Sequence, residues 1–234
     1  MELKVNQEQI DRLYRFTREH FVEHYDLQTE LVDHLSNAIE QQWIENPKLP
    51  FEEALQKEFK KFGVFGFMNV VEQRQAALQK KYNLLIWKHF KSFFSIPKII
   101  VTISLIIALF YFFKYVFFYE LMAFGMLLWF LFLVIALLYE KKRMKKRKNQ
   151  TGKKWMFEEI IYGYGSFSGV FTFPIHMMNL FSNQGNGTPN DFVLFGISFF
   201  LVSVFIGTYI VTKIIPSKAE EYLNQTYPEY TFLS

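Results

Sequence analysis

The pattern of hydrophobic and polar positions changes character near residue 95. Before this point, apolar residues recur every three or four positions, as they do along one face of a helix, and no alternating strand pattern is present. After it, the chain holds four nearly continuous apolar stretches. The pattern therefore predicts an all-α fold, in which a cytoplasmic helical domain (1–94) precedes a four-helix transmembrane bundle (95–212) and a cytoplasmic tail (213–234).

Four helices are predicted in the N-terminal domain. Asn6 is placed to cap the first and Asp26 the second. The third is expected over about 51–62, with Gly63 as its stop, and the fourth begins near Phe67 and runs toward the membrane. The apolar stripes of the first two helices are Ile10, Leu13, Tyr14, Phe21 and Tyr25, and then Leu27, Leu31, Leu35, Ala38, Ile39 and Trp43.

Each of the four apolar stretches is long enough to cross about 30 Å of hydrocarbon, which takes about 20 residues. They cover about 99–119, 121–139, 160–181 and 192–212. The first two are separated only by a tight turn near Glu120, so they are expected to form an antiparallel hairpin. Lys114, the one charge inside the first stretch, is expected to reach the outer membrane interface.

A cluster of basic residues lies between the second and third stretches. Because loops rich in Lys and Arg stay on the cytoplasmic side, this cluster predicts a bacterial inner-membrane protein with both termini in the cytoplasm. The formal net charge of +4 and pI near 9.0 are therefore attributed to topology and lipid contact rather than to nucleic acid. The cluster is Lys141, Lys142, Arg143, Lys145, Lys146, Arg147, Lys148, Lys153 and Lys154.

Small residues at a spacing of four suggest where helices approach closely. Gly165 and Gly169 in the third stretch, and Ser203 and Gly207 in the fourth, are predicted to serve helix packing within the bundle. A contact between two copies of the chain is the alternative use. Near the outer end of the third stretch, Pro174, His176 and Asn179 indicate a kinked, interfacial helix end, with a ligand-sensing role as the alternative.

Composition excludes several kinds of chemistry. The chain has no cysteine, which rules out disulfides, thiolate nucleophiles and Cys-ligated metals. No Asp or Glu lies inside a predicted span, since Glu158 and Glu159 fall at the cytoplasmic edge. Proton- or cation-coupled transport usually needs buried ionisable groups, so a solitary transporter is disfavoured. No cofactor is predicted.

One short motif has a chemical interpretation. His20, Glu23 and His24 spell H-x-x-E-H, the inverted zinc-peptidase motif. On a helix the two histidines lie about 40° apart, and Glu30 or His34 could complete a metal site. The competing interpretation is that the histidines line a seam between helices, the acids are solvated and Asp26 caps a helix.

Three short motifs follow one another between residues 27 and 72: Glu30 to Leu35 (E-L-V-D-H-L), Pro50 to Leu55 (P-F-E-E-A-L) and Lys61 to Gly63 (K-F-G). In these motifs the segment resembles the HAAS-type helical domain of bacterial membrane signalling and regulatory proteins. The Gly-x-Pro that usually follows is replaced here by Gly63-Val64-Phe65-Gly66. The resemblance implies a small helical domain ahead of several membrane spans, associated with regulation alongside transcription regulators or transport systems.

These observations predict a non-enzymatic, multi-pass membrane protein that acts through protein–protein contacts in signalling, regulation or complex assembly. The helix that enters the membrane is expected to pass rearrangements of the bundle to the first three helices. Expected partners are the lipid bilayer and a protein at the N-terminal domain, with a second copy of the chain as a further candidate. One alternative is an accessory subunit of a transport complex. The other is a metal-dependent membrane enzyme that uses His20, Glu23 and His24.

Overall fold

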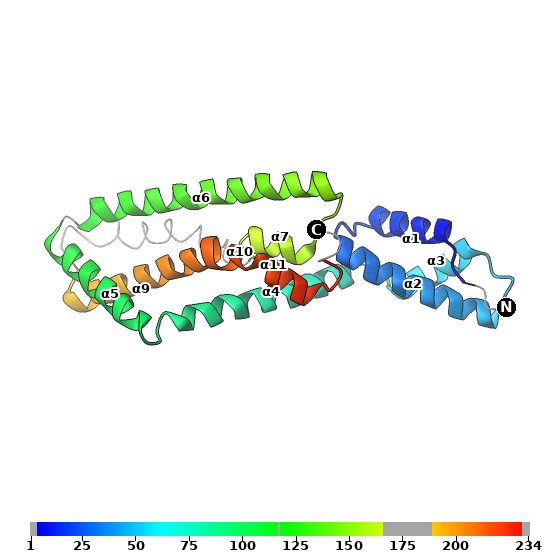
Figure 1. The fold of residues 1–234 in the computed structure, drawn as a ribbon, viewed down its shortest axis with the longest axis horizontal. Helices are drawn as coiled ribbons and strands as arrows, with labels where there is room; N and C mark the ends of the chain where they lie inside the picture. The colour runs from blue at the N-terminus through cyan, green and yellow to red at the C-terminus, as the bar shows by residue number, and fades with distance from the viewer. Residues whose placement is uncertain (1–3, 117, 166–188, 231–234) are drawn as a thin grey trace.

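The computed structural model describes residues 4–116, 118–165 and 189–230, with only the backbone at 118–123. These residues form an elongated, all-helical molecule with the N-terminal domain at one end and the apolar helices at the other (Figure 1). The N-terminal domain contains α1 (Gln7–Glu19), α2 (Tyr25–Glu45) and α3 (Phe51–Lys61), and α4 (Met68–Ser92) leads away from it. The remaining elements are α5 (Lys98–Tyr115), α6 (Phe118–Thr151), α7 (Met156–Tyr162), α9 (Asp191–Tyr209), the π-helical turn η2 (Ile210–Ile214), α10 (Ile215–Ser217) and α11 (Ala219–Thr226).

Helix α1 starts where the sequence predicts but ends earlier. Asn6 and Gln9 form a reciprocal capping box at its start. The predicted stripe runs on to Tyr25, whereas the helix stops at Glu19 because the chain turns back: Val22 N–H donates to the Thr17 carbonyl (3.0 Å). Phe21, a predicted core residue, has a positive φ of 66° and is 78% exposed. Residues 20–24 are therefore a turn between two helices.

Helices α2 and α3 form where the periodicity predicts them, and they pack against each other. Leu27, Leu31 and Leu35 are buried, and the Trp43 indole N–H donates to the Leu49 carbonyl across the loop (2.8 Å). Gly63 ends α3 with a φ of +79°, and Gly66 follows with a φ of +54°. A Cβ at Gly66 would lie 2.8 Å from the Phe59 ring, so this turn requires a residue without a side chain.

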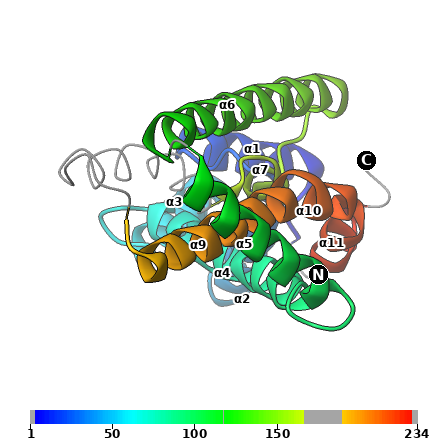
Figure 2. The ribbon, with the colours of Figure 1, turned by 90° about the vertical axis from the view of Figure 1, so that its left-hand side faces the viewer.

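Three helical segments are long and apolar enough to cross a membrane: 98–115, 124–151 and 191–217. They indicate a membrane protein. In the described residues α5 packs along α9 rather than along α6 (Figure 2). The two helices are antiparallel, with Lys114 Nζ 2.7 Å from Asp191 Oδ2 at one end and the Phe93 and Tyr209 rings in contact at the other. The predicted hairpin of the first two spans is not confirmed: α5 packs mainly along α9, while α6 meets this pair at Met126, which clusters with Phe113 and Leu194.

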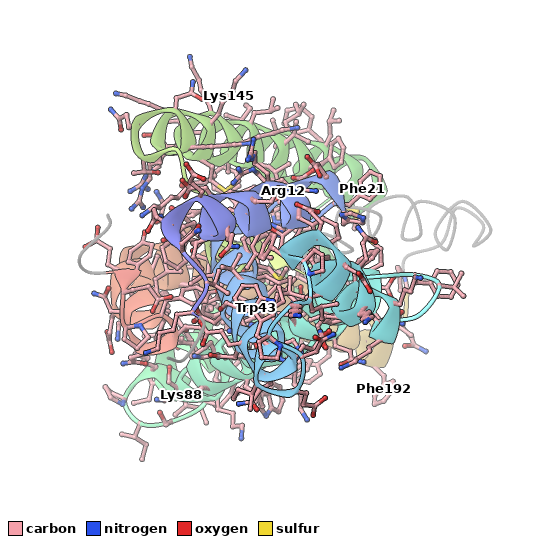
Figure 3. All side chains as sticks on the ribbon, turned by 90° about the vertical axis from the view of Figure 1, so that its right-hand side faces the viewer. Arg12, Phe21, Trp43, Lys88, Lys145 and Phe192 are labelled. Atoms are coloured by element: carbon pink, nitrogen blue, oxygen red, sulfur yellow. The ribbon has the colours of Figure 1, made fainter. Side chains whose placement is uncertain are left out.

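The second apolar helix is much longer than the predicted span. Glu120, the expected site of the turn, lies inside α6, and the connection falls between Tyr115 and Phe118. At its other end α6 continues without a break through the basic cluster to Thr151, so residues 141–148 are helical rather than a loop. Figure 1 shows α6 running beside α9, α10 and α7 and ending where the N-terminal domain begins, and Figure 3 shows Lys145 on its outer side.

The third predicted span, 160–181, lies mostly outside the described residues. Its first residues complete α7, which ends at Tyr162. Tyr164 and Gly165 then adopt positive φ values of 62° and 48°, and a Cβ at Gly165 would lie 2.7 Å from the Tyr82 ring of α4. The described start of this stretch is therefore a short helix and a tight turn packed on α4.

One hydrophobic core joins the two ends of the molecule. It runs from the N-terminal domain through α4 and α7 to the tail and the inner half of α9. Six of the seven residues of α7 are buried, and Phe157 and Ile161 are fully buried. Full burial of side chains of this size stabilises a fold by about 1.5–3 kcal/mol each, so α7 is a major contact between the parts of the chain.

Candidate functional site

The tail, α7 and the start of α2 meet in a cluster that combines buried polar groups with aromatic rings. We call this cluster the junction. Its members come from three segments that are far apart in the sequence and adjacent in the fold (Figure 1). They are Glu23, His24, Tyr25 and Asp26; Arg147, Lys154, Trp155, Met156, Phe157, Glu158 and Glu159; and Tyr227 and Tyr230.

Asp26 lies at the centre of the junction. Its carboxylate is buried and accepts two hydrogen bonds, from Met156 N–H (3.1 Å) and from the Tyr227 hydroxyl (2.8 Å). The same hydroxyl accepts the Phe157 N–H (3.2 Å). The first N–H groups of a helix have no partner within it, so Asp26 and Tyr227 together cap the N-terminus of α7.

Tyr227 is held in this role by its surroundings. Burial and the neighbouring Asp26 carboxylate both raise the pKa of the Tyr227 hydroxyl far above its usual value, so it remains a donor at every physiological pH. Trp155 packs beside it, with ring centroids 4.9 Å from Tyr227, 5.2 Å from Tyr230 and 5.3 Å from Tyr25. The rings keep water away from the Asp26 hydrogen bonds.

A chain of charged groups lies at the outer side of the junction. His24 Nε2 is 2.7 Å from Glu159 Oε2, and Lys154 Nζ lies 3.0 Å from Glu159 and 2.8 Å from Glu23. The hydrogen bond from His24 and the contact with Lys154 lower the pKa of Glu159 to about 2. The hydrogen bond from Lys154 likewise lowers the pKa of Glu23. Both carboxylates are therefore ionised at neutral pH.

A second ion pair fastens α6 to α7 and the tail. Arg147 Nη1 lies 3.0 Å from Glu158 Oε1, and Arg147 Nη2 donates to the Tyr230 hydroxyl (2.7 Å). Burial raises the pKa of Glu158 more than Arg147 lowers it. Burial likewise raises the pKa of Tyr230 to about 12. Removal of one partner from a buried ion pair strongly destabilises a protein, because the other charge is left buried and unpaired. The Arg147–Glu158 pair therefore fixes the position of α6 against α7.

The candidate metal residues are not assembled at one point. The His20 ring packs against Phe16 and Phe59, and its Nδ1 lies 2.8 Å from the Phe16 carbonyl. His24 faces Glu159, and H-x-x-E-H occupies a turn instead of one helical face. Glu30 lies 4.0 Å from Arg74, and the His34 ring contacts Phe62. Among the described residues, no three His, Asp or Glu side chains gather as a metal would require.

The predicted helix-packing residues have different environments. Gly165 lies in a turn against Tyr82 rather than in a helix, and Gly169 is outside the described residues, as are Pro174, His176 and Asn179. Ser203 donates to the Phe199 carbonyl of its own helix, and Gly207 is buried.

The residues of the basic cluster fall into two groups that differ in their contacts. Lys141, Lys142, Lys145, Lys146 and Lys148 are exposed. Arg143 lies over the Tyr162 ring, Lys153 over the Tyr25 ring, and Arg147 and Lys154 make the ion pairs described above. These four residues therefore make specific contacts within the fold. A signal for membrane topology needs only their positive charge.

Sequence reasoning missed most of the junction. Asp26 was predicted to cap α2, whereas its carboxylate caps α7, which is 130 residues away in the sequence. The tail was predicted only as a cytoplasmic extension, although Tyr227 and Tyr230 are 2% exposed. The sequence contains two signals that could have pointed to the junction. They are the closely spaced tyrosines of the tail and the two adjacent acids Glu158 and Glu159.

No protein-family model, curated protein or solved structure matches this chain.

Proposed function

We propose that this chain is a non-enzymatic, multi-pass protein of the bacterial inner membrane whose N-terminal helical domain binds a partner protein in signalling, regulation or complex assembly. The observation that supports this most directly is the junction. Asp26 ties the N-terminal domain to both the tail and α7 through buried hydrogen bonds, so the domain is positioned by the membrane-spanning part.

The contacts support four crossings with both termini in the cytoplasm. Asp26 and Tyr227 are hydrogen-bonded, so the segments before α5 and after α9 lie on one side, which requires an even number of crossings. The fourth crossing is the predicted span at 160–181, most of which lies outside the described residues. Its described neighbours support this assignment, because Gly165 lies against Tyr82 while Asp191 pairs with Lys114 at the far end of α5. The exposed lysines of α6 favour the cytoplasm for the junction side.

The mechanism follows from the two connections between the parts. Helix α4 runs from the N-terminal domain to Ser92, where the turn at 93–97 connects it to α5, and the fully buried Tyr82 anchors α4 beside α7. The junction is the second connection. A movement of the spans that shifts α4 relative to α7 therefore changes the orientation of α1–α3, which is the property that a signalling or assembly protein needs.

The N-terminal domain provides the surface for a partner. Residues 1–46 hold ten acids and four bases, and most of the acids in the described part are exposed. This charge favours a partner with a basic face. The resemblance of residues 27–72 to HAAS-type domains gives the same expectation of a regulatory partner.

Site-specific photo-crosslinking in native membranes tests this function. A photo-reactive residue at Asp33, which is exposed on α2, should give a discrete adduct with a second protein, and Lys146 on the outer side of α6 is the matched control position. Asp26→Asn should lower the yield at position 33, because it weakens the junction. Absence of an adduct at every exposed position of α1–α3, or the same adducts at 33 and 146, would argue against the proposed function.

A further inference from the structure

A cleft with a volume of about 820 Å³ lies between α1, the start of α2 and the C-terminal end of α6. We infer that this basic cleft is a binding site for a small soluble ligand with two or more phosphate groups. The inference does not depend on the proposed function, because binding of such a ligand can occur with or without a protein partner. The lining residues used in the argument are Arg15, Arg18, Tyr14, Tyr25, Lys148 and Lys153.

Helix α1 contributes two cations that form no ion pair with any carboxylate in the described part of the chain. Arg15 and Arg18 are three residues apart, so they project from one face of α1, and both line the cleft. Both are exposed, and within the described part of the chain neither lies within ion-pair distance of a carboxylate. Arg12, one turn earlier on the same helix, does not line the cleft and pairs with Glu19 and Glu52. The arginines of α1 that line the cleft are thus those that have no ion-pair partner in the described part of the chain.

The opposite wall is also cationic. Lys148 lines the cleft from α6, and no carboxylate of the described chain pairs with it either. Lys153 lies over the Tyr25 ring, with its Nζ 4.4 Å from the ring centroid. Lys154 is neutralised by Glu23 and Glu159. Cations from two segments of opposite halves of the chain therefore face one another across the cleft.

The lining of the cleft holds five cations and two carboxylates, so its net charge is positive. Glu23 pairs with Lys154, and Asp11 accepts a hydrogen bond from Gln7 (3.2 Å) while keeping its charge. The carbonyl groups at the end of α6 would repel an anion, but the Lys148 carbonyl accepts Gly152 N–H (2.8 Å) and the Arg147 carbonyl accepts the Thr151 hydroxyl (3.1 Å). What remains for a ligand is an excess of donors, which an anion satisfies.

The size and composition of the cleft indicate the class of anion. A volume in the range of about 300–1,000 Å³ is that of sites for small molecules and cofactors. Arginine presents a planar fork of donors that suits phosphate, and several cations spread over two walls require more than one phosphate group. Tyr14 and Tyr25 also line the cleft, with their rings stacked on each other (interplanar angle 5°).

The position of the cleft favours a soluble ligand over a lipid headgroup. Lys148 lies nine residues beyond Tyr139, the last residue of the predicted second span. At the helical rise of about 1.5 Å per residue, this places Lys148 about 14 Å beyond the apolar part of α6. A headgroup has the same phosphate chemistry, so the test includes a lipid arm.

The test is calorimetric titration of the full-length protein in zwitterionic detergent, with ATP and with inorganic tripolyphosphate as the probes. We expect saturable binding at about 0.15 M salt, where attraction between distant charges is largely screened. The double variant R15Q/R18Q should lose at least about tenfold in affinity, since it removes charge-assisted hydrogen bonds. The control, K141Q/K142Q, removes the same charge from exposed positions of α6 outside the cleft, and its affinity should stay within about twofold of wild type.

Each alternative result has a defined meaning. Protection from hydrogen exchange at residues 11–18 and 148–154 upon addition of ATP would place the ligand in the cleft. The inference is overturned if neither probe binds the wild-type protein, or if both double variants lose affinity equally. It is also overturned if binding that depends on Arg15 and Arg18 is found only with phosphatidylglycerol in nanodiscs. That result would assign the cleft to a lipid headgroup.

Discussion

Removal of one buried hydroxyl should release the tail. In Tyr227→Phe the ring remains, but the Asp26 carboxylate loses a 2.8 Å donor and Phe157 N–H loses its acceptor. A hydrogen bond to a charged group contributes about 1.5–3 kcal/mol, and a buried N–H without a partner costs about 1 kcal/mol or more. We therefore expect opening of the tail from α7 to become easier by about 2–4 kcal/mol.

Hydrogen exchange measures this opening. Because about 1.4 kcal/mol corresponds to a tenfold change in an equilibrium, the amides of α11 should exchange about 30- to 700-fold faster in Tyr227→Phe. Tyr222→Phe, inside α11 and five residues before Tyr227, is the matched control. Its hydroxyl pairs with His89 Nε2 (2.8 Å) at a part-buried site, so the loss is that of an ordinary hydrogen bond, about 0.5–1.5 kcal/mol.

The reasoning also predicts how the two junction residues combine. Once Asp26→Asn has weakened the shared hydrogen bond, Tyr227→Phe should cost less than it does alone, with a coupling energy of about 1–3 kcal/mol. Exchange in α11 that is unchanged by Tyr227→Phe, or additive effects of the two substitutions, would refute the assignment of Asp26 and Tyr227 as the link between the N-terminal domain and the tail.

Three further outcomes are expected. Because the pKa of Glu159 is lowered to about 2, the stability it contributes is fully present above about pH 4.5 and is lost as pH falls toward 2. Since this side chain is 46% exposed, solvent screening reduces that contribution to roughly 1 kcal/mol, so the melting temperatures of wild type and Glu159→Gln should converge at low pH. Gly165→Ala should destabilise by about 2–3 kcal/mol because of its positive φ and its crowded Cβ position, whereas Gly196→Ala, with open space around it, should change thermal stability by less than about 1 kcal/mol; equal effects would contradict the assigned turn. The absence of native cysteine allows a direct topology test with an impermeant maleimide, in which a cysteine at Asn190 should react in intact cells and one at Lys145 only after permeabilisation, and the reverse pattern would exclude the proposed orientation.

Much of the N-terminal domain could be predicted because its helices are defined by local signals. The Asn6 cap, the leucine stripe of α2 and the Gly63 stop all act within a few residues, so they can be identified without knowledge of distant contacts. The length of α1 could not be predicted in this way. Its stripe continues to Tyr25, but hydrogen bonds from the returning chain end the helix at Glu19.

The candidate site was less accessible to sequence reasoning. The H-x-x-E-H pattern suggested a metal site only on the assumption that it was helical, and the turn at residues 20–24 removes that geometry. The functions of Asp26 and Tyr227 depend on each other although they are 201 positions apart, and no local pattern contains that information. Partner and oligomeric state remain predictions.

The sequence by itself determined that the chain is helical, that its second half contains membrane-spanning helices and where its basic residues gather, because hydropathy and charge act on each segment independently of the others. The tertiary structure decided which helices pair, that residues 141–148 of the basic cluster belong to α6, and that the tail and Asp26 close around α7. These features depend on burial and on the satisfaction of backbone N–H groups by side chains from distant segments. Both arise only when the whole chain is assembled.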